Sequence, residues 1–106
     1  MVISAKNILN ARNEMGDAIL RTPMIYSPGL SQMTGADIHL KLENQQMTSS
    51  FKPRGAFTRM AALDKEDALR GVIAMSAGNH AQAVAYHAQR KNVPSVIVMP
   101  AQTPFS

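Results

Sequence analysis

One lysine, Lys52, stands where a polar run ends and a helix is expected to begin. A lysine that condenses with an aldehyde must spend time as the neutral amine, which desolvation or a neighbouring cation favours. Phe51 and Arg54 are neighbours that could supply each of these. The same residues also fit an ordinary solvated helix start with a serine cap. Local spacing therefore leaves both a Schiff-base lysine and a structural lysine open.

A second polar group, Ser76-Ala77-Gly78-Asn79-His80, lies between a short apolar run and a helical pattern. Ligands dock at the carboxyl ends of strands in open α/β sheets, and the free amides of a helix start attract carboxylate or phosphate. An anion site is therefore one interpretation. The other makes Gly78 a turn residue and Asn79 a helix cap, and local chemistry does not separate the two.

The three histidines do not predict a metal site. His80 and His87 are seven residues apart on one expected helix, which places them about 10 Å apart, too far for one ion. His39 lies on a different element, so solvated histidines are the better interpretation. The chain has no cysteine, which excludes disulfides and thiolate zinc sites.

Composition points to a folded, soluble, cytosolic protein. Apolar residues make up 45% of the 106 residues and charged residues 17%, as in ordinary globular proteins. No stretch is long and apolar enough for a signal peptide or a membrane span, so membrane roles are not expected. The net charge is +4, but the basic residues are scattered and aromatic residues make up only 5%. A small nucleic-acid-binding module is therefore the least favoured interpretation, because such modules gather basic residues on one face and place aromatic side chains among them.

The elements that must position these residues begin with a helix. Ser4 can cap a helix with apolar residues at three- and four-residue spacing, which Thr22-Pro23 would stop. Turns are expected at 27–29 and 34–36, and alternation over 37–43 predicts a half-buried strand. Residues 44–50 then form a loop.

The second half predicts an α/β unit. Pro53 suits the first turn of a helix that reaches about Leu63. Residues 72–75 predict a strand covered on both faces, and a helix follows from His80 to about Lys91. Its apolar stripe is Ala81, Val84, Ala85 and Ala88. A second buried strand over 95–99 makes the order strand, helix, strand, and hence a parallel pair.

The segment around Lys52 and the segment Ser76–His80 together resemble the signatures of the serine/threonine dehydratase family of pyridoxal-phosphate enzymes (fold type II). Residues 50–56, Ser-Phe-Lys-Pro-Arg-Gly-Ala, resemble the family's cofactor-attachment motif, and residues 76–82, Ser-Ala-Gly-Asn-His-Ala-Gln, resemble its substrate loop. Residues 21–23, 40–44 and 98–100 resemble family positions in the same order. Ser49 stands where a glycine is common, and Pro53 where an aliphatic residue often lies.

The resemblance implies an open, twisted parallel sheet with helices on both faces, like the β subunit of tryptophan synthase and incomplete in this chain. Residues 1–50 would belong to the larger domain of that fold and residues 51–106 to the first part of the smaller one. The family's glycine-rich phosphate loop and the partner of the pyridine nitrogen come later in its longer chains. We therefore expect a fragment with little or no activity alone.

The resemblance also assigns chemistry. Lys52 would hold pyridoxal 5'-phosphate as an imine and remove the Cα proton, so that threonine, and serine too, gives a 2-oxo acid and ammonia. Phe51 would pack near the cofactor ring and Asn79 would bind its hydroxyl. Ser76, Ala77, Gly78, Asn79 and His80 would hold the substrate carboxylate. A homo-oligomeric, cytoplasmic enzyme of amino-acid metabolism, such as isoleucine biosynthesis, is implied.

Two rivals stay open. Serine racemases look alike over this stretch but typically carry a second serine in the substrate loop, where this chain has Ala77. An alanine cannot carry a proton, which favours elimination over two-base racemisation. The other rival is a non-catalytic truncated product.

Overall fold

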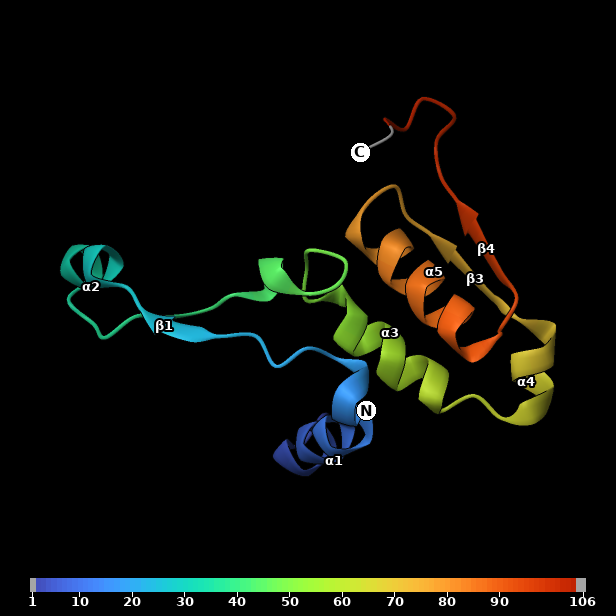
Figure 1. Ribbon diagram of the computed structural model, residues 1–106, viewed down its shortest axis with the longest axis horizontal. Helices are drawn as coiled ribbons and strands as arrows, with labels where there is room; N and C mark the ends of the chain where they lie inside the picture. Colours follow the sequence, from blue (N-terminus) through green and yellow to red (C-terminus); the bar gives the residue numbers. More distant parts are fainter. Residues whose placement is uncertain (1, 105–106) are drawn as a thin grey trace.

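The computed structural model describes residues 2–104 and divides into a packed unit and a projecting arm (Figure 1). The arm is the amino-terminal part of the chain: α1 Ala5–Met15, η1 Gly16–Ala18, β1 Met24–Tyr26, α2 Pro28–Thr34, β2 His39–Lys41 and η2 Glu43–Gln45. The packed unit follows it: α3 Lys52–Ala61, α4 Lys65–Arg70, β3 Val72–Met75, α5 Asn79–Lys91 and β4 Ser95–Val98. Helix α1 of the arm contacts α3, whereas β1 and α2 extend away from the packed unit.

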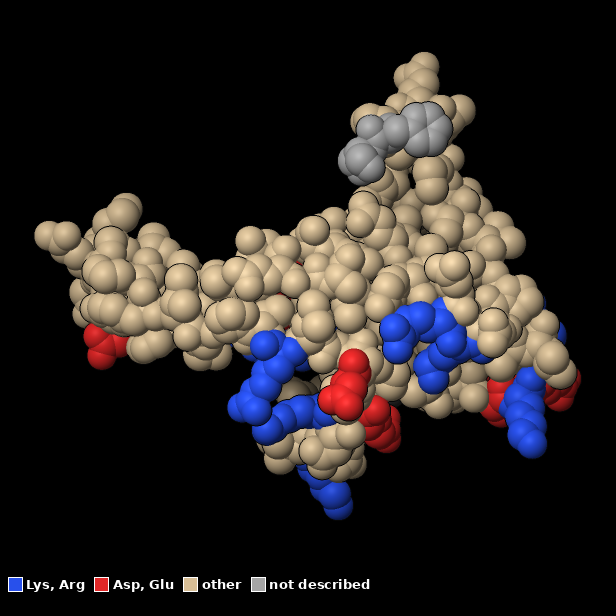
Figure 2. All heavy atoms as spheres, viewed as in Figure 1, with Lys and Arg blue, Asp and Glu red and all other residues tan. Residues whose placement is uncertain are grey.

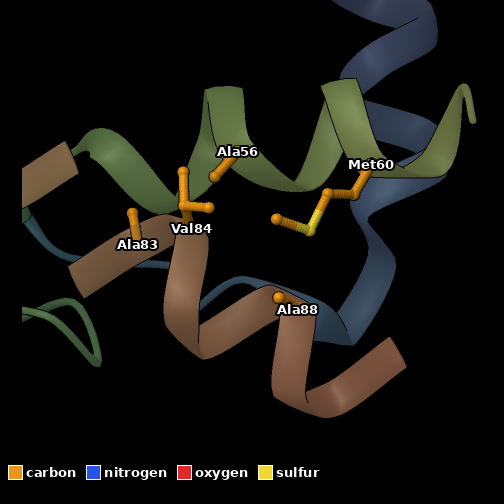
Figure 3. Packing of buried hydrophobic residues seen from close by; sticks show 5 residues of the cluster. All are labelled: Ala56, Met60, Ala83, Val84 and Ala88. Carbon is orange, nitrogen blue, oxygen red and sulfur yellow. The ribbon is translucent and has the colours of Figure 1, made fainter. Parts of the chain in front are cut away.

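The packed unit is the α/β unit that the sequence predicts. Strands β3 and β4 pair in parallel from Val72 opposite Ser95 to Met75 opposite Val98, with α5 as the crossover. Helices α3 and α5 lie side by side over a small core of Ala56, Met60, Ala83, Val84 and Ala88 (Figure 3). Because Ala56 lies near Val84 and Met60 near Ala88, both helices run in the same direction.

Only one face of this sheet is covered within residues 2–104. Val72, Ala74 and Ile97 pack against the helical core, whereas the alternate side chains Ile73 and Met75 are 73% and 83% exposed. The expected strand covered on both faces is therefore wrong for the part of the chain that the structure describes. The parallel α/β arrangement itself is confirmed.

The arm departs most from expectation. The half-buried strand predicted over 37–43 is the three-residue β2, which is exposed throughout and pairs antiparallel with β1. The expected turns at 27–29 and 34–36 are instead the two ends of α2. Pro28 starts this helix with its fixed φ, and Gly35 ends it at φ 71 in the left-handed region.

Helix α1 begins as predicted and ends early. Ser4 accepts a hydrogen bond from the backbone N–H of Asn7, and the Asn7 side chain accepts one from the Ser4 backbone, which forms a capping box. The helix stops at Met15 because Gly16 adopts φ 45, so Thr22-Pro23 is not the stop. No helix within residues 2–104 is long and apolar enough to cross a membrane.

Helix α5 carries a different buried stripe from the one expected. Ala81, Val84 and Ala88 are buried as predicted, but Ala85 is exposed. Ala83 and His87 are buried in its place, at 0% and 1% exposure. The prediction of solvated histidines is therefore wrong for His87 and right for His39 and His80. Helix α4, capped by Asp64, was not expected at all.

Figure 2 shows how charge is distributed over one face of the molecule. The Lys and Arg side chains form several separate groups, and Asp and Glu side chains lie beside some of them. The positive charge does not gather in one continuous patch on this face.

Candidate active site

Lys52 is the first residue of α3, and its neighbours hold the start of this helix. The Ser50 hydroxyl accepts a hydrogen bond from the Lys52 backbone N–H at 3.3 Å, and Pro53 occupies the first turn, fully buried. The Lys52 side chain is exposed, with Nζ 5.2 Å from the centroid of the Phe51 ring. Within residues 2–104 no carboxylate pairs with it. The amine is therefore available to a ligand.

The segment Ser76–His80 follows β3 directly and leads into α5. The Ser76 backbone N–H donates to the Val98 carbonyl at 3.0 Å, which ties the loop to the end of β4. The Gly78 backbone N–H donates to the Ser76 hydroxyl at 3.2 Å. Gly78, not Asn79, is the cap residue, and no side chain among residues 2–104 caps α5. The first amides of α5 are thus left for an anion, as at other uncapped helix starts.

The two segments lie at the same end of the packed unit. Because α3 and α5 run side by side in the same direction, Lys52 and Asn79 both lie at the end where these helices begin (Figure 1). Ala77, Gly78 and Asn79 are exposed there, as is Phe51 at 61%. His80 also lines a hollow of about 520 Å³ between α3, β3 and α5, together with Gly55 and Arg59. The candidate site is an open surface, not an enclosed cavity.

Comparison with known proteins identifies the family in which this arrangement of helices and strands occurs. The model of the family described as "Pyridoxal-phosphate dependent enzyme" matches residues 15–106. The chain belongs to this family. Its arrangement of α3, α5 and the parallel strands is thus part of the fold of a fold type II pyridoxal-phosphate enzyme.

Three relatives show which enzymes of this family the chain resembles. The chain is 47% identical to the L-threonine ammonia-lyase of Thermotoga maritima over 99% of its own length and 26% of that enzyme's. The structure of maize serine racemase matches with a TM-score of 0.88 at 35% identity, over 98% of this chain and 32% of that one. Tomato threonine deaminase isoform 2 matches with a TM-score of 0.76 at 36% identity, over 96% and 31%. The chain thus spans about a quarter to a third of these relatives.

The residues at the end where α3 and α5 begin carry the chemical groups that the family's cofactor needs. A primary amine that no carboxylate of residues 2–104 pairs with is the group that binds the cofactor aldehyde. The exposed amide side chain of Asn79 can donate to a ring hydroxyl, and the uncapped start of α5 can take a carboxylate. Phe51 contributes an exposed ring beside the amine. The individual assignments of these residues stay predictions.

An ion pair next to Lys52 was not expected. Arg54 Nε lies 2.8 Å from Glu43 Oε2, and Arg54 Nη2 lies 2.9 Å from Oε1, so the contact is bidentate. The guanidinium of Arg54 and the hydroxyl of Thr22 lower the pKa of Glu43 to about 2, against the opposing effect of burial. Glu43 in turn raises the pKa of Arg54. Arg54 is therefore a compensated charge and not the free cation that the sequence suggested beside Lys52.

His87, on α5, is a second buried side chain near the start of α3. Its ring meets Phe57 edge-on, with centroids 5.6 Å apart, and Tyr86 at 5.1 Å. Burial lowers the pKa of His87, with smaller effects from Arg90 and Lys91, while the backbone of Pro53 acts in the other direction. Its Nε2 is buried without a hydrogen-bond partner within residues 2–104. The neutral imidazole therefore packs α5 against the first turn of α3. The sequence does carry a signal for the burial of His87: it lies three residues after Val84 and next to Ala88, and so falls on the buried face of α5.

Proposed function

We propose that the complete protein is a pyridoxal-phosphate-dependent ammonia-lyase that converts threonine, and also serine, to a 2-oxo acid and ammonia. The observation that carries the proposal is that α3 and α5 begin at the same end of the packed unit, so that this end carries both the exposed Lys52 amine and the uncapped start of α5. Resemblance to threonine ammonia-lyase at 47% identity supports the same reaction.

Each residue has a distinct task in this proposal. The bound pyridoxal phosphate supplies an electron sink for the pair of electrons left when the Cα–H bond breaks. Lys52 holds the cofactor and, as a free amine, accepts the Cα proton. The loop Ser76–His80 and the first amides of α5 bind the substrate carboxylate, and Asn79 orients the cofactor ring. Loss of the β-hydroxyl as water, followed by hydrolysis, yields 2-oxobutanoate and ammonia from threonine.

A lysine substitution in the complete protein tests this assignment. Lys52→Ala should abolish the visible absorption that appears on adding pyridoxal phosphate, and ammonia release from threonine with it. Lys65→Ala is the matched control, because Lys65 is also an exposed first residue of a helix, α4, but lies in a different part of the packed unit. Borohydride reduction and peptide mapping should place the pyridoxyl group on Lys52. Turnover retained by Lys52→Ala, or an adduct on another lysine, would refute the proposal.

Serine racemisation is the second candidate, since the maize serine racemase structure matches with a TM-score of 0.88. Ala77 argues against it, because two-base racemisation needs a proton carrier on the opposite face of the substrate and a methyl group cannot be one. The complete protein should therefore form no D-serine from L-serine. Ala77→Ser should increase D-serine formation relative to ammonia release. D-serine formation by the unchanged protein would favour the racemase.

The remaining features of the proposal follow from the family resemblance. Residues 1–50 would belong to the larger domain and residues 51–106 to the smaller domain. We further propose a cytoplasmic homo-oligomer of amino-acid metabolism, with isoleucine biosynthesis as the pathway, that acts on a small amino acid and not on nucleic acid or membranes.

A further inference from the structure

Polar side chains join the arm to the loop before Lys52. The Gln46 side chain, 4% exposed, brackets Leu20: its Nε2 donates to the Leu20 carbonyl at 2.7 Å, and its Oε1 accepts from the Leu20 N–H at 3.2 Å. Lys41 Nζ donates to the Thr22 carbonyl, and the Thr22 hydroxyl donates to Glu43 Oε1. With Arg54 these residues form one connected set, which we call the clamp: Leu20, Thr22, Lys41, Glu43, Gln46 and Arg54.

Glu43 is the centre of the clamp because it contacts both of the other segments. Its Oε1 accepts from the Thr22 hydroxyl and from Arg54, and its Oε2 accepts from Arg54. The Glu43 side chain is only 15% exposed and that of Arg54 34%, so the pair is shielded more than a surface ion pair. Removing one partner would leave the other poorly solvated and without its hydrogen bonds.

The position of Arg54 determines what the clamp does to Lys52. Two residues apart on a helix correspond to a rotation of about 200°, so the side chains of Lys52 and Arg54 leave α3 on nearly opposite sides. Arg54 is held to Glu43, eleven residues earlier, by two parallel hydrogen bonds. A planar guanidinium bound through two nitrogens fixes orientation as well as distance. The first turn of α3 therefore cannot rotate about its axis without breaking this contact.

We propose that Glu43 and Arg54 are positioning residues that aim the Lys52 amine by fixing the rotation of the first turn of α3. The inference deepens the proposed function, on which it rests, and concerns two residues to which that function gives no contact with the cofactor or the substrate. The loop between them supports the need for such a device. Ser49 within it adopts φ 54, a conformation that costs a non-glycine residue free energy and that the surrounding contacts must hold.

The test compares four variants of the complete protein. Glu43→Gln removes the charge, and Glu43→Asp is too short to keep both Arg54 and Thr22. Arg54→Lys keeps the charge but loses the bidentate contact. Glu66→Gln is the matched control, because Glu66 pairs with Arg70 at 3.7 Å on the surface, where its side chain is 82% exposed. Three readouts follow the effect: hydrogen exchange of residues 44–56 without cofactor, visible-region circular dichroism of the bound cofactor, and the steady-state constants kcat and KM.

Glu43→Gln and Arg54→Lys should speed exchange over residues 44–56 about tenfold or more, while residues 81–91 of α5 stay unchanged. The dichroism per bound cofactor should fall, because that signal reports how the chromophore is oriented. Turnover should fall through kcat more than through KM, since a misaimed amine impairs proton transfer and not carboxylate binding. Glu43→Asp should lie in between, and Glu66→Gln should match the unchanged protein.

Three results would overturn the inference: unchanged exchange over residues 44–56, unchanged dichroism, or an Arg54→Lys variant indistinguishable from the unchanged protein. If a Glu43 variant fails to fold, Thr22→Val, which removes only one donor to Glu43, gives the same comparison with a smaller expected change. Failure of the proposed function is a separate result. A protein that binds cofactor on Lys52 but releases no ammonia from threonine loses that function, while the exchange and dichroism still decide the role of the clamp.

Discussion

The packed unit and the arm are held together by different forces. The packed unit, residues 52–98, has an apolar core in which Ala83 and Ala88 are fully buried. In residues 2–42 of the arm Ile19 is the one buried hydrophobic residue, and large side chains such as Met24 and Met33 are 65% and 82% exposed. The arm is joined to the rest of the molecule by the contact of α1 with α3, by the hydrogen bonds between Gln46 and Leu20, and by the ion pair of Glu43 with Arg54.

This difference explains how Lys52 is positioned, since it lies where the two regions meet. Apolar packing of α3 on α5 fixes where the helix lies, and the ion pair of Arg54 with Glu43 fixes how its first turn is rotated. Apolar packing is non-directional, whereas a bidentate ion pair is directional. Substitutions of equal size should therefore have unequal effects in the two regions.

The largest contrast should come from two glycines with positive φ. A Cβ at Gly71, φ 90, would lie 2.5 Å from the Pro94 carbonyl oxygen, whereas a Cβ at Gly35, φ 71, would meet nothing within 4 Å among the described residues. Gly71→Ala should cost about 4 kcal/mol from backbone strain and overpacking together. Gly35→Ala should cost only the conformational strain, about 1 kcal/mol. Peptide-resolved hydrogen exchange of β3 and α2 would measure both, and equal costs would contradict the close approach at Gly71.

Two methionines provide the next comparison. Met60 is 6% exposed in the core of the packed unit, and Met33 is 82% exposed on α2. Met60→Ala should destabilise the packed unit by about 3 kcal/mol, because it removes buried methylenes and leaves a cavity. Met33→Ala should change stability by less than about 0.5 kcal/mol. Denaturant unfolding of the two variants checks this, and a large cost for Met33→Ala would mean that α2 is buried in the protein in solution.

The sequence predicts the two regions unequally well for the same reason. Burial imposes a regular apolar pattern, so β3 was expected at its observed bounds and α5 within one residue of its start. The exposed elements β1 and α2 carry no such pattern, and both were missed. Local motifs and the family resemblance pointed to Lys52 and to the segment 76–80. The clamp has no local signal, because Thr22, Glu43 and Arg54 come from three separate segments.

Acidification should loosen the two regions in sequence. Burial lowers the pKa of His87 below its usual 6.5, so the stability that its neutral form contributes to the packed unit is full above pH 6.5 and declines as the pH falls below it. The pKa of Glu43 is about 2, against a usual value of 4.5, so its contribution is full above pH 4.5 and is lost as the pH falls toward 2. That difference corresponds to up to about 3 kcal/mol.

Hydrogen exchange at a series of pH values, corrected for intrinsic rates, separates the two steps. Residues 81–91 of α5 should lose protection first, below pH 6.5, and residues 44–56 further below pH 4.5. His87→Phe, which keeps an aromatic ring without a titrating group, should abolish the first step alone, and Glu43→Gln should abolish the second alone. Loss of both steps in either single variant would show that the regions unfold as one unit and not in sequence.

The smallest expected effect concerns two residues with positive φ, one in the loop between the two regions and one in the packed unit. Ser49, φ 54, lies in the polar loop before Lys52, and Asn92, φ 53, ends α5 in the left-handed conformation. Ser49→Gly should relieve about 1 kcal/mol of backbone strain and lose about half of it to the greater freedom of glycine in the unfolded chain. The loop should gain about 0.5 kcal/mol, seen as slower hydrogen exchange over residues 44–51. Asn92→Gly should gain less, because asparagine tolerates this conformation better than serine. A destabilised Ser49→Gly protein would mean that the Ser49 hydroxyl, and not the clamp alone, holds the loop that presents Lys52.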